Sequence, residues 1–326
     1  MHFARPEKRA EDELAGVMLL RAQVCCAAVG KPYMEREHTG AAAPHGDLAI
    51  GVFDSGVGGL TVLKALLARL PREDFIYLGD TARLPYGTKS PGSIRQYALQ
   101  ASRRLHDHGV KCLVVACNTA SAIALDVLTQ EFTPVPVIGV LGPGAAAACR
   151  ATRTGRVAVL ATESTVRGGA YQAAIARRRP DAIVTARACP LFVALAEEGW
   201  TDGPVVDGVI HRYLDDAFVH PAPDTRPDTL LLGCTHFPVL APALARVLGP
   251  DVAIVDSAAT TAVALEATLA AHGLARDAGR DVGRVRLLAT DGAERFARVG
   301  GVFLGRSLVA GDVEIVDLAP AAASVG

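Results

Sequence analysis

Short apolar runs alternate with stretches of helical periodicity from Ala49 onward, and this alternation limits the possible folds more than any other feature of the chain. Each run has the length of a buried strand, and each intervening stretch can hold a helix that crosses to the next strand. The runs are Ala49 to Phe53, Phe75 to Leu78, Cys112 to Ala116, Val137 to Val140, Val157 to Leu160, Ala182 to Thr185, Thr229 to Leu232, Val252 to Val255 and Val285 to Leu288. This order predicts an α/β fold with helices on both faces of parallel sheets.

An internal similarity predicts two such sheets. IGVFDSGVGGL begins at Ile50 and VAVLATESTVRGGAY begins at Val157, and each has a strand, a turn with hydroxyl groups, glycines and a helix. Cys117 and Cys234 also end two similar apolar runs, LVVA and LLLG. The offsets of 107 and 117 residues are close enough to indicate a diverged duplication, although any two βα units look somewhat alike. We therefore predict two similar parallel-sheet α/β domains with the active site in the cleft between them.

Charge and cysteine usage indicate an enzyme for small molecules in a reducing compartment. The 326 residues carry a net charge of -1 and no basic stripe, so we expect no nucleic acid and no membrane surface as partner. The seven cysteines are an odd number at scattered positions, without a C-x-x-C pair, so neither a disulfide framework nor a zinc site is predicted. The segment from Leu14 to Gly30 follows acidic residues and contains Arg21, unlike a signal peptide. We expect a cytoplasmic protein.

The first 47 residues read differently from the rest. They contain a polar, small-residue run, KPYMEREHTGAAAPHGD, that is typical of a linker. We expect a flexible N-terminal extension over 1–47, and Met34 is an alternative start of the chain.

Cys117 and Cys234 are the candidate reactive groups. The carboxyl ends of strands are where open α/β sheets bind ligands, so both thiols are expected there. Two thiols presented by two similar units suit a reaction that needs an acid or base on each face of a substrate, such as racemisation. A buried cysteine is more often a small hydrophobic residue, which is how we interpret Cys112 and Cys149.

Polar residues beside the thiols supply donors for a substrate. Asn118 and Thr119 follow Cys117, and Thr235 and His236 follow Cys234. The turn from Asp54 to Gly59 precedes a helix expected near Leu60 to Leu70, where backbone amides and the helix dipole favour an anion. The turn lacks the full spacing of a nucleotide-binding loop, so a carboxylate fits better than a pyrophosphate. Asp54 has an ordinary alternative as the N-cap of that helix.

Five motifs carry a family resemblance. IGVFDSGVGGLTVL, YLGDTARLPYGTKS, VVACNTASA, ACPLFVALAEEGW and LLGCTHFPVL, in that order, resemble the glutamate racemases of the aspartate/glutamate racemase superfamily. The resemblance runs from about Ala49 to beyond Asp256. It implies a racemase that needs no cofactor and no metal, built from two α/β domains, which supplies D-glutamate for bacterial peptidoglycan.

The resemblance assigns roles residue by residue. It makes Cys117 the base toward D-glutamate and Cys234 the base toward L-glutamate, with Asp54 supporting the first and His236 the second. Glu197, the first of the Glu197-Glu198 pair, matches a further acidic residue near the second cysteine, and which of the two faces the site is left open. The ATEST turn, 161–165, departs from a glycine-threonine pattern of the family. The expected substrate contacts are Asp54, Ser55, Pro85, Tyr86, Gly87, Asn118, Thr119, Thr162, Thr165, Thr235 and His236.

The same resemblance and the duplication predict the domain boundaries. Residues 48–140 and 262–326, including the apolar runs at Val285 and Ile315, form the first domain, and residues 141–261 form the second. Alternative functions are an aspartate or related amino-acid racemase, a cysteine hydrolase or transferase that uses Cys234 alone, and a nucleotide-binding module based on DSGVGG. The oligomeric state is left open, with a homodimer as the assembly to test.

Overall fold

The computed structural model describes residues 45–219, 221, 224–277 and 282–318. The chain separates into two compact units, 1–42 and 43–326, and every described residue belongs to the second. Residues 1–44 of the expected extension, Met34 among them, lie outside the described residues. Its last residues, η1 (His45–Asp47), form a 3-10 turn, and the Gly46 carbonyl accepts a hydrogen bond from Lys111 at 2.7 Å.

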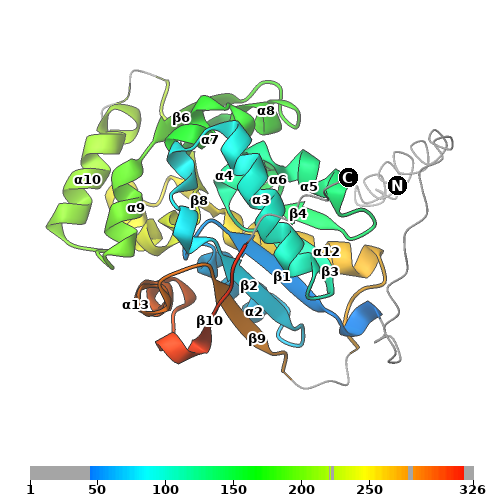
Figure 1. Ribbon diagram of the computed structural model, residues 1–326. Helices are drawn as coiled ribbons and strands as arrows, with labels where there is room; N and C mark the ends of the chain where they lie inside the picture. Colours follow the sequence, from blue (N-terminus) through cyan, green and yellow to red (C-terminus); the bar gives the residue numbers. More distant parts are fainter. Residues whose placement is uncertain (1–44, 220, 222–223, 278–281, 319–326) are drawn as a thin grey trace, which may run out of the picture. The chain divides into compact units, whose positions relative to one another are not determined.

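Ten strands form two sheets, and every strand pairing among the described residues is parallel. The six-stranded sheet has the order β10-β9-β2-β1-β3-β4, and the four-stranded sheet has the order β6-β5-β7-β8 (Figure 1). The strands are β1 (Ala49–Asp54), β2 (Phe75–Gly79), β3 (Val110–Val115), β4 (Val137–Gly139), β5 (Arg156–Ala161), β6 (Ile183–Ala188), β7 (Thr229–Gly233), β8 (Ala253–Asp256), β9 (Val285–Ala289) and β10 (Val313–Ile315). All nine predicted runs form strands, so the predicted fold class is confirmed.

The two sheets repeat one topology. The order β2-β1-β3-β4 in the first sheet matches β6-β5-β7-β8 in the second, strand for strand. Cys117 follows β3 and Cys234 follows β7, which hold equivalent places in the two sheets. This correspondence agrees with the internal duplication indicated by the sequence. Strands β9 and β10 extend only the six-stranded sheet.

Helices cover both faces of each sheet. The helices are α2 (Leu60–Arg69), α3 (Pro91–His106), α4 (Asn118–Ile123), α5 (Leu125–Glu131), α6 (Leu141–Ala151), α7 (Glu163–Arg167), α8 (Ala170–Ala176), α9 (Pro190–Glu197), α10 (Pro204–Leu214), α11 (Ala241–Leu248), α12 (Ser257–Ala271) and α13 (Ala293–Leu304). On the six-stranded sheet, α2, α12 and α13 bury their apolar side chains against one face, and α3, α4 and α5 against the other. On the four-stranded sheet, α9, α10 and α11 cover one face, and α6 and α8 the other.

Helix α12 connects the helices of the two sheets. It packs against α2, which covers the six-stranded sheet, and against α6, which covers the four-stranded sheet. The predicted domain boundary at 261/262 falls inside this helix. Among the described residues, no helix combines the length and the apolar character needed to cross a membrane.

Candidate active site

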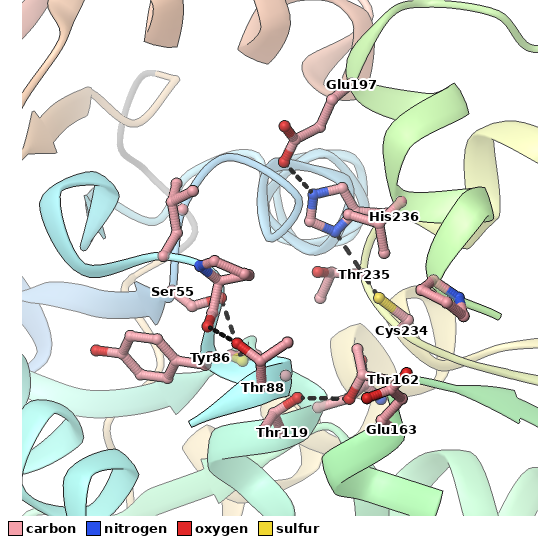
Figure 2. Close-up of a pocket in the computed structure, with 18 residues that line it drawn as sticks. Ser55, Tyr86, Thr88, Thr119, Thr162, Glu163, Glu197, Cys234, Thr235 and His236 are labelled. Carbon is pink, nitrogen blue, oxygen red and sulfur yellow. Dashed lines mark hydrogen bonds and ion pairs between the residues drawn. The ribbon is translucent and has the colours of Figure 1, made fainter. Parts of the chain in front are cut away.

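A cavity of about 190 Å³ lies at the carboxyl ends of strands from both sheets, and both Cys117 and Cys234 line it. Figure 2 shows this cavity, with Cys234 labelled. This volume is below the range of about 300 to 1,000 Å³ typical of drug-sized ligands, so it suits a small metabolite. The lining residues are Ser55, Gly56, Leu84, Pro85, Tyr86, Gly87, Thr88, Cys117, Asn118, Thr119, Thr162, Glu163, Pro190, Val193, Glu197, Cys234, Thr235 and His236.

Cys117 is placed by the end of β3 and the start of α4. It is the N-cap of α4, and its sulfur accepts a hydrogen bond from the Ala120 amide at 3.5 Å while it lies 3.5 Å from the Ser55 hydroxyl. Burial and the nearby Asp54 carboxylate raise the pKa of the Cys117 thiol to about 12, although these two hydrogen bonds oppose the rise. Cys117 is therefore held as a neutral thiol at neutral pH.

Cys234 lies beside a histidine, whereas Cys117 lies near a carboxylate. The Nδ1 atom of His236 lies 3.8 Å from its sulfur, and the Nε2 atom lies 3.1 Å from Oε1 of Glu197 (Figure 2). Burial favours neutral imidazole, but the hydrogen bonds and charges of Cys234 and Glu197 outweigh it and raise the pKa of His236 well above its usual range. A histidine cation therefore lies beside the Cys234 sulfur.

Asp54 lies behind the cavity wall and does not line it. It is fully buried, and Oδ2 accepts hydrogen bonds from the Gly56 amide at 3.0 Å and the Tyr77 hydroxyl at 3.3 Å. Burial raises the pKa of this carboxyl despite the backbone hydrogen bonds and the nearby His236. The N-cap of α2 is Gly59 and not Asp54, so the alternative interpretation of Asp54 as a cap does not apply.

The glycines after Asp54 allow close packing. The first amides of α2, at Leu60 and Thr61, donate to the Val57 and Gly58 carbonyls at 3.1 Å, so they are not available to a substrate carboxylate as the sequence suggested. A Cβ atom added at Gly58 would lie 2.5 Å from two ring atoms of His236. The missing side chain lets this loop of the six-stranded sheet approach a histidine of the other sheet.

A buried carboxylate anchors the loop that carries Pro85, Tyr86 and Gly87. Asp80, at the end of β2, accepts hydrogen bonds from the Tyr86 hydroxyl at 2.5 Å, from Arg83 at 2.7 Å and from Thr290 at 3.1 Å. This network fixes the position of the loop that forms one wall of the cavity.

Hydroxyl and amide groups from both sheets meet on another wall. The Thr119 hydroxyl lies 3.0 Å from that of Thr162 and 3.4 Å from that of Thr165. Asn118 donates to the Tyr171 hydroxyl at 2.6 Å, and its side-chain oxygen has no hydrogen-bond partner in the structure. That buried oxygen is an acceptor that a substrate ammonium group could satisfy.

Most of the predicted site residues are brought together here. All the predicted site residues except Asp54 and Thr165 line the cavity, and the Thr165 hydroxyl contacts two that do. Glu197 lines it, whereas Glu198 is exposed to solvent. The sequence interpretation missed Gly56, Leu84, Thr88, Glu163, Pro190 and Val193. Most adjoin predicted residues along the chain, so the signal was proximity to a motif.

Comparison with known proteins agrees with the fold and shows the family. The family model of the Asp/Glu/hydantoin racemases matches residues 50–265, and the chain belongs to this family of isomerases. The glutamate racemase of Geobacter metallireducens is 48% identical over 270 residues, which is 83% of this chain and 97% of that protein.

Two solved structures are similar along nearly their whole length. Glutamate racemase from Francisella tularensis in complex with D-glutamate has a TM-score of 0.75 and 36% identity, and the match covers 84% of this chain and 98% of that one. Glutamate racemase from Thermus thermophilus in complex with beta-chloro-D-alanine has a TM-score of 0.73 and 44% identity, with the same coverage.

Proposed function

We propose that this protein is a glutamate racemase that interconverts L- and D-glutamate through Cys117 and Cys234, without a cofactor, and so supplies D-glutamate for peptidoglycan synthesis. The observation that carries the proposal is that two thiols, each at the end of an equivalent strand in a different sheet, line one small cavity. The relatives named glutamate racemase, matched over nearly their whole length, support the choice of substrate.

The groups around the two thiols decide which cysteine acts as the first base. In the resting protein the Cys234 thiolate, beside the His236 cation, removes the Cα proton of L-glutamate and leaves the electron pair on Cα. The Cys117 thiol then gives its proton to the opposite face of Cα, which forms D-glutamate. After this turnover Cys234 is the thiol and Cys117 the thiolate, ready for the reverse reaction.

The cavity wall must stabilise the negative charge that develops next to the substrate carboxylate. Among its described lining residues none is Lys or Arg, so hydroxyl groups and backbone amides are the available donors, together with His236. Such fixed dipoles act strongly where water is excluded. The unpartnered oxygen of Asn118 suits the substrate ammonium group, whose positive charge also favours loss of the Cα proton.

Circular dichroism of purified protein with L-glutamate, D-glutamate or L-aspartate tests the proposal. We expect loss of optical activity with both enantiomers of glutamate and early incorporation of solvent deuterium into the product in deuterated water. Cys117→Ala and Cys234→Ala should each abolish racemisation in both directions, because every turnover uses both groups. Cys149→Ala, in helix α6 outside the cavity, is the matched control.

Three outcomes would contradict the proposal. Retention of substantial activity by either alanine variant would refute the two-base assignment, and return of substrate-derived hydrogen to the product would indicate a single base. Racemisation of aspartate in preference to glutamate would select the related amino-acid racemase instead.

Three finer expectations belong to the same proposal. The domain division at 140/141 and 261/262 agrees with the distribution of strands between the sheets. A cytoplasmic location agrees with the free cysteines at the described positions 112, 117, 149, 189 and 234. A homodimer is the assembly to test, and light scattering of the purified protein at several concentrations measures it.

A further inference from the structure

Arg295, on helix α13, is the outermost member of a chain of contacts that ends at Cys234. Its guanidinium group donates to Oε2 of Glu197 at 2.7 Å, and Oε1 of the same carboxylate lies 3.1 Å from His236. His236 in turn lies 3.8 Å from the Cys234 sulfur. Arg295 itself does not line the cavity, so any effect on the thiol passes through Glu197.

The ion pair between Arg295 and Glu197 links two helices that cover different sheets. Glu197 is the last residue of α9, which covers the four-stranded sheet, whereas α13 packs on the six-stranded sheet. Figure 2 shows the Glu197 side chain reaching back toward the His236 ring, in line with Cys234. A carboxylate at a helix end has rotational freedom, and a second partner on its other oxygen limits that freedom.

The charges alternate in sign along this series of contacts. From the cavity to the surface, the order is Cys234 as a thiolate, His236 as a cation, Glu197 as a carboxylate and Arg295 as a cation. The hydrogen bond from His236, aided by Arg295, lowers the pKa of Glu197 in spite of partial burial. Glu197 therefore remains a carboxylate that fixes the orientation of the imidazole and keeps it protonated.

We propose that Arg295 is a positioning residue for the base at Cys234, because it holds the Glu197 carboxylate against His236 from the opposite sheet. This inference rests on the proposed function for its catalytic consequence only. Removal of Arg295 loosens the Glu197 carboxylate and, with it, the orientation of the His236 ring beside the Cys234 sulfur. Alkylation of Cys234 at neutral pH should therefore become slower.

The expected effect is modest. The Arg295 side chain is 51% exposed and that of Glu197 is 17% exposed, so solvent screens part of the interaction. Ion pairs of this kind support a fall of about two- to fivefold in kcat/KM, and a fall of similar size in the rate of Cys234 alkylation at neutral pH. Since the two enantiomers of glutamate have equal free energy, kcat/KM must fall equally in both directions.

The test compares Arg295→Met with Arg298→Met, an exposed arginine of the same helix that forms no ion pair with any described residue. Two quantities are measured: kcat/KM for glutamate, and the rate of alkylation of Cys234 by iodoacetamide against pH, with peptide mapping to separate Cys234 from Cys117. Arg295→Met should change both quantities and Arg298→Met neither. Arg295→Lys, which keeps the charge, should restore part of the loss.

A double-mutant cycle distinguishes positioning from a general effect on stability. In a Glu197→Ala background, Arg295→Met should cause little further change, because its route to the thiol is already absent. An undiminished effect in that background, or equal behaviour of the two methionine variants, would overturn the inference. The alkylation measurement needs no turnover, so it decides the role of Arg295 even if glutamate proves not to be the substrate.

Discussion

Asp228 ties the start of strand β7 to the loop before β5, and its replacement gives a measurable test of what holds the four-stranded sheet together. Oδ1 accepts a hydrogen bond from the Thr152 hydroxyl at 2.6 Å. Oδ2 accepts from the backbone amides of Arg153 and Thr154, both at 2.8 Å. Strand β7 pairs directly with β5 and leads to Cys234, so this carboxylate supports the strand that presents the thiol.

The contribution of the Asp228 charge follows from its pKa. Burial alone would raise the pKa, but the hydrogen bonds outweigh burial and lower it from 3.8 to about 2. Each pKa unit corresponds to about 1.4 kcal/mol, so the charge contributes about 2 kcal/mol to the free energy of unfolding. Because the folded-state pKa lies below the unfolded one, this contribution is present above pH 3.8 and is lost as the pH falls toward 2.

Urea unfolding of Asp228→Asn, followed by circular dichroism, measures the contribution. The variant keeps the shape of the side chain but removes the charge, so we expect the free energy of unfolding at pH 7 to fall by about 2 kcal/mol with an unchanged slope against urea. The difference from wild type should shrink at about pH 3. Asp251→Asn, an exposed aspartate next to β8, is the control. Equal unfolding midpoints for wild type and Asp228→Asn at pH 7 would refute the reasoning.

Two further predictions concern the site. Gly58→Ala should lower kcat by about ten- to a hundredfold, because the new Cβ displaces the His236 ring, whereas Gly92→Ala, where a Cβ meets nothing within 4 Å, should not; steady-state kinetics of both variants checks this. At neutral pH iodoacetamide should modify Cys234 before Cys117, because burial raises the pKa of Cys117 to about 12, and peptide mapping over time would contradict this by showing the reverse order.

The sheets could be predicted because parallel strands are buried on both faces and therefore read as continuous apolar runs. Strand β7, for example, is TLLLG and is buried throughout. Because helices separate these strands along the sequence, parallel pairing was the expected arrangement. The division of the strands into two sheets was predictable only because the motif before Cys117 is repeated before Cys234.

The site was predictable where its residues share a motif, and not where contacts join distant segments. Ser55, at the DSGVGG turn, lines the cavity as expected, but the reason for Gly58 is the His236 ring, which is 178 residues away along the chain. Arg295 lies 98 residues from Glu197 and in none of the motifs that suggested the family. Neither spacing nor composition carries information about such approaches, because they depend on how two sheets meet.

The duplicated halves place the two thiols symmetrically, yet the groups around them break that symmetry. The buried Asp54 carboxylate opposes ionisation of Cys117, whereas a protonated imidazole lies beside the Cys234 sulfur. A two-base reaction requires one thiolate and one thiol at the start, and two identical surroundings could not assign them. In the proposed mechanism, the unlike neighbours select Cys234 as the first base. Each turnover then inverts an arrangement that the protein favours, and the reverse reaction, or proton exchange with solvent, restores it.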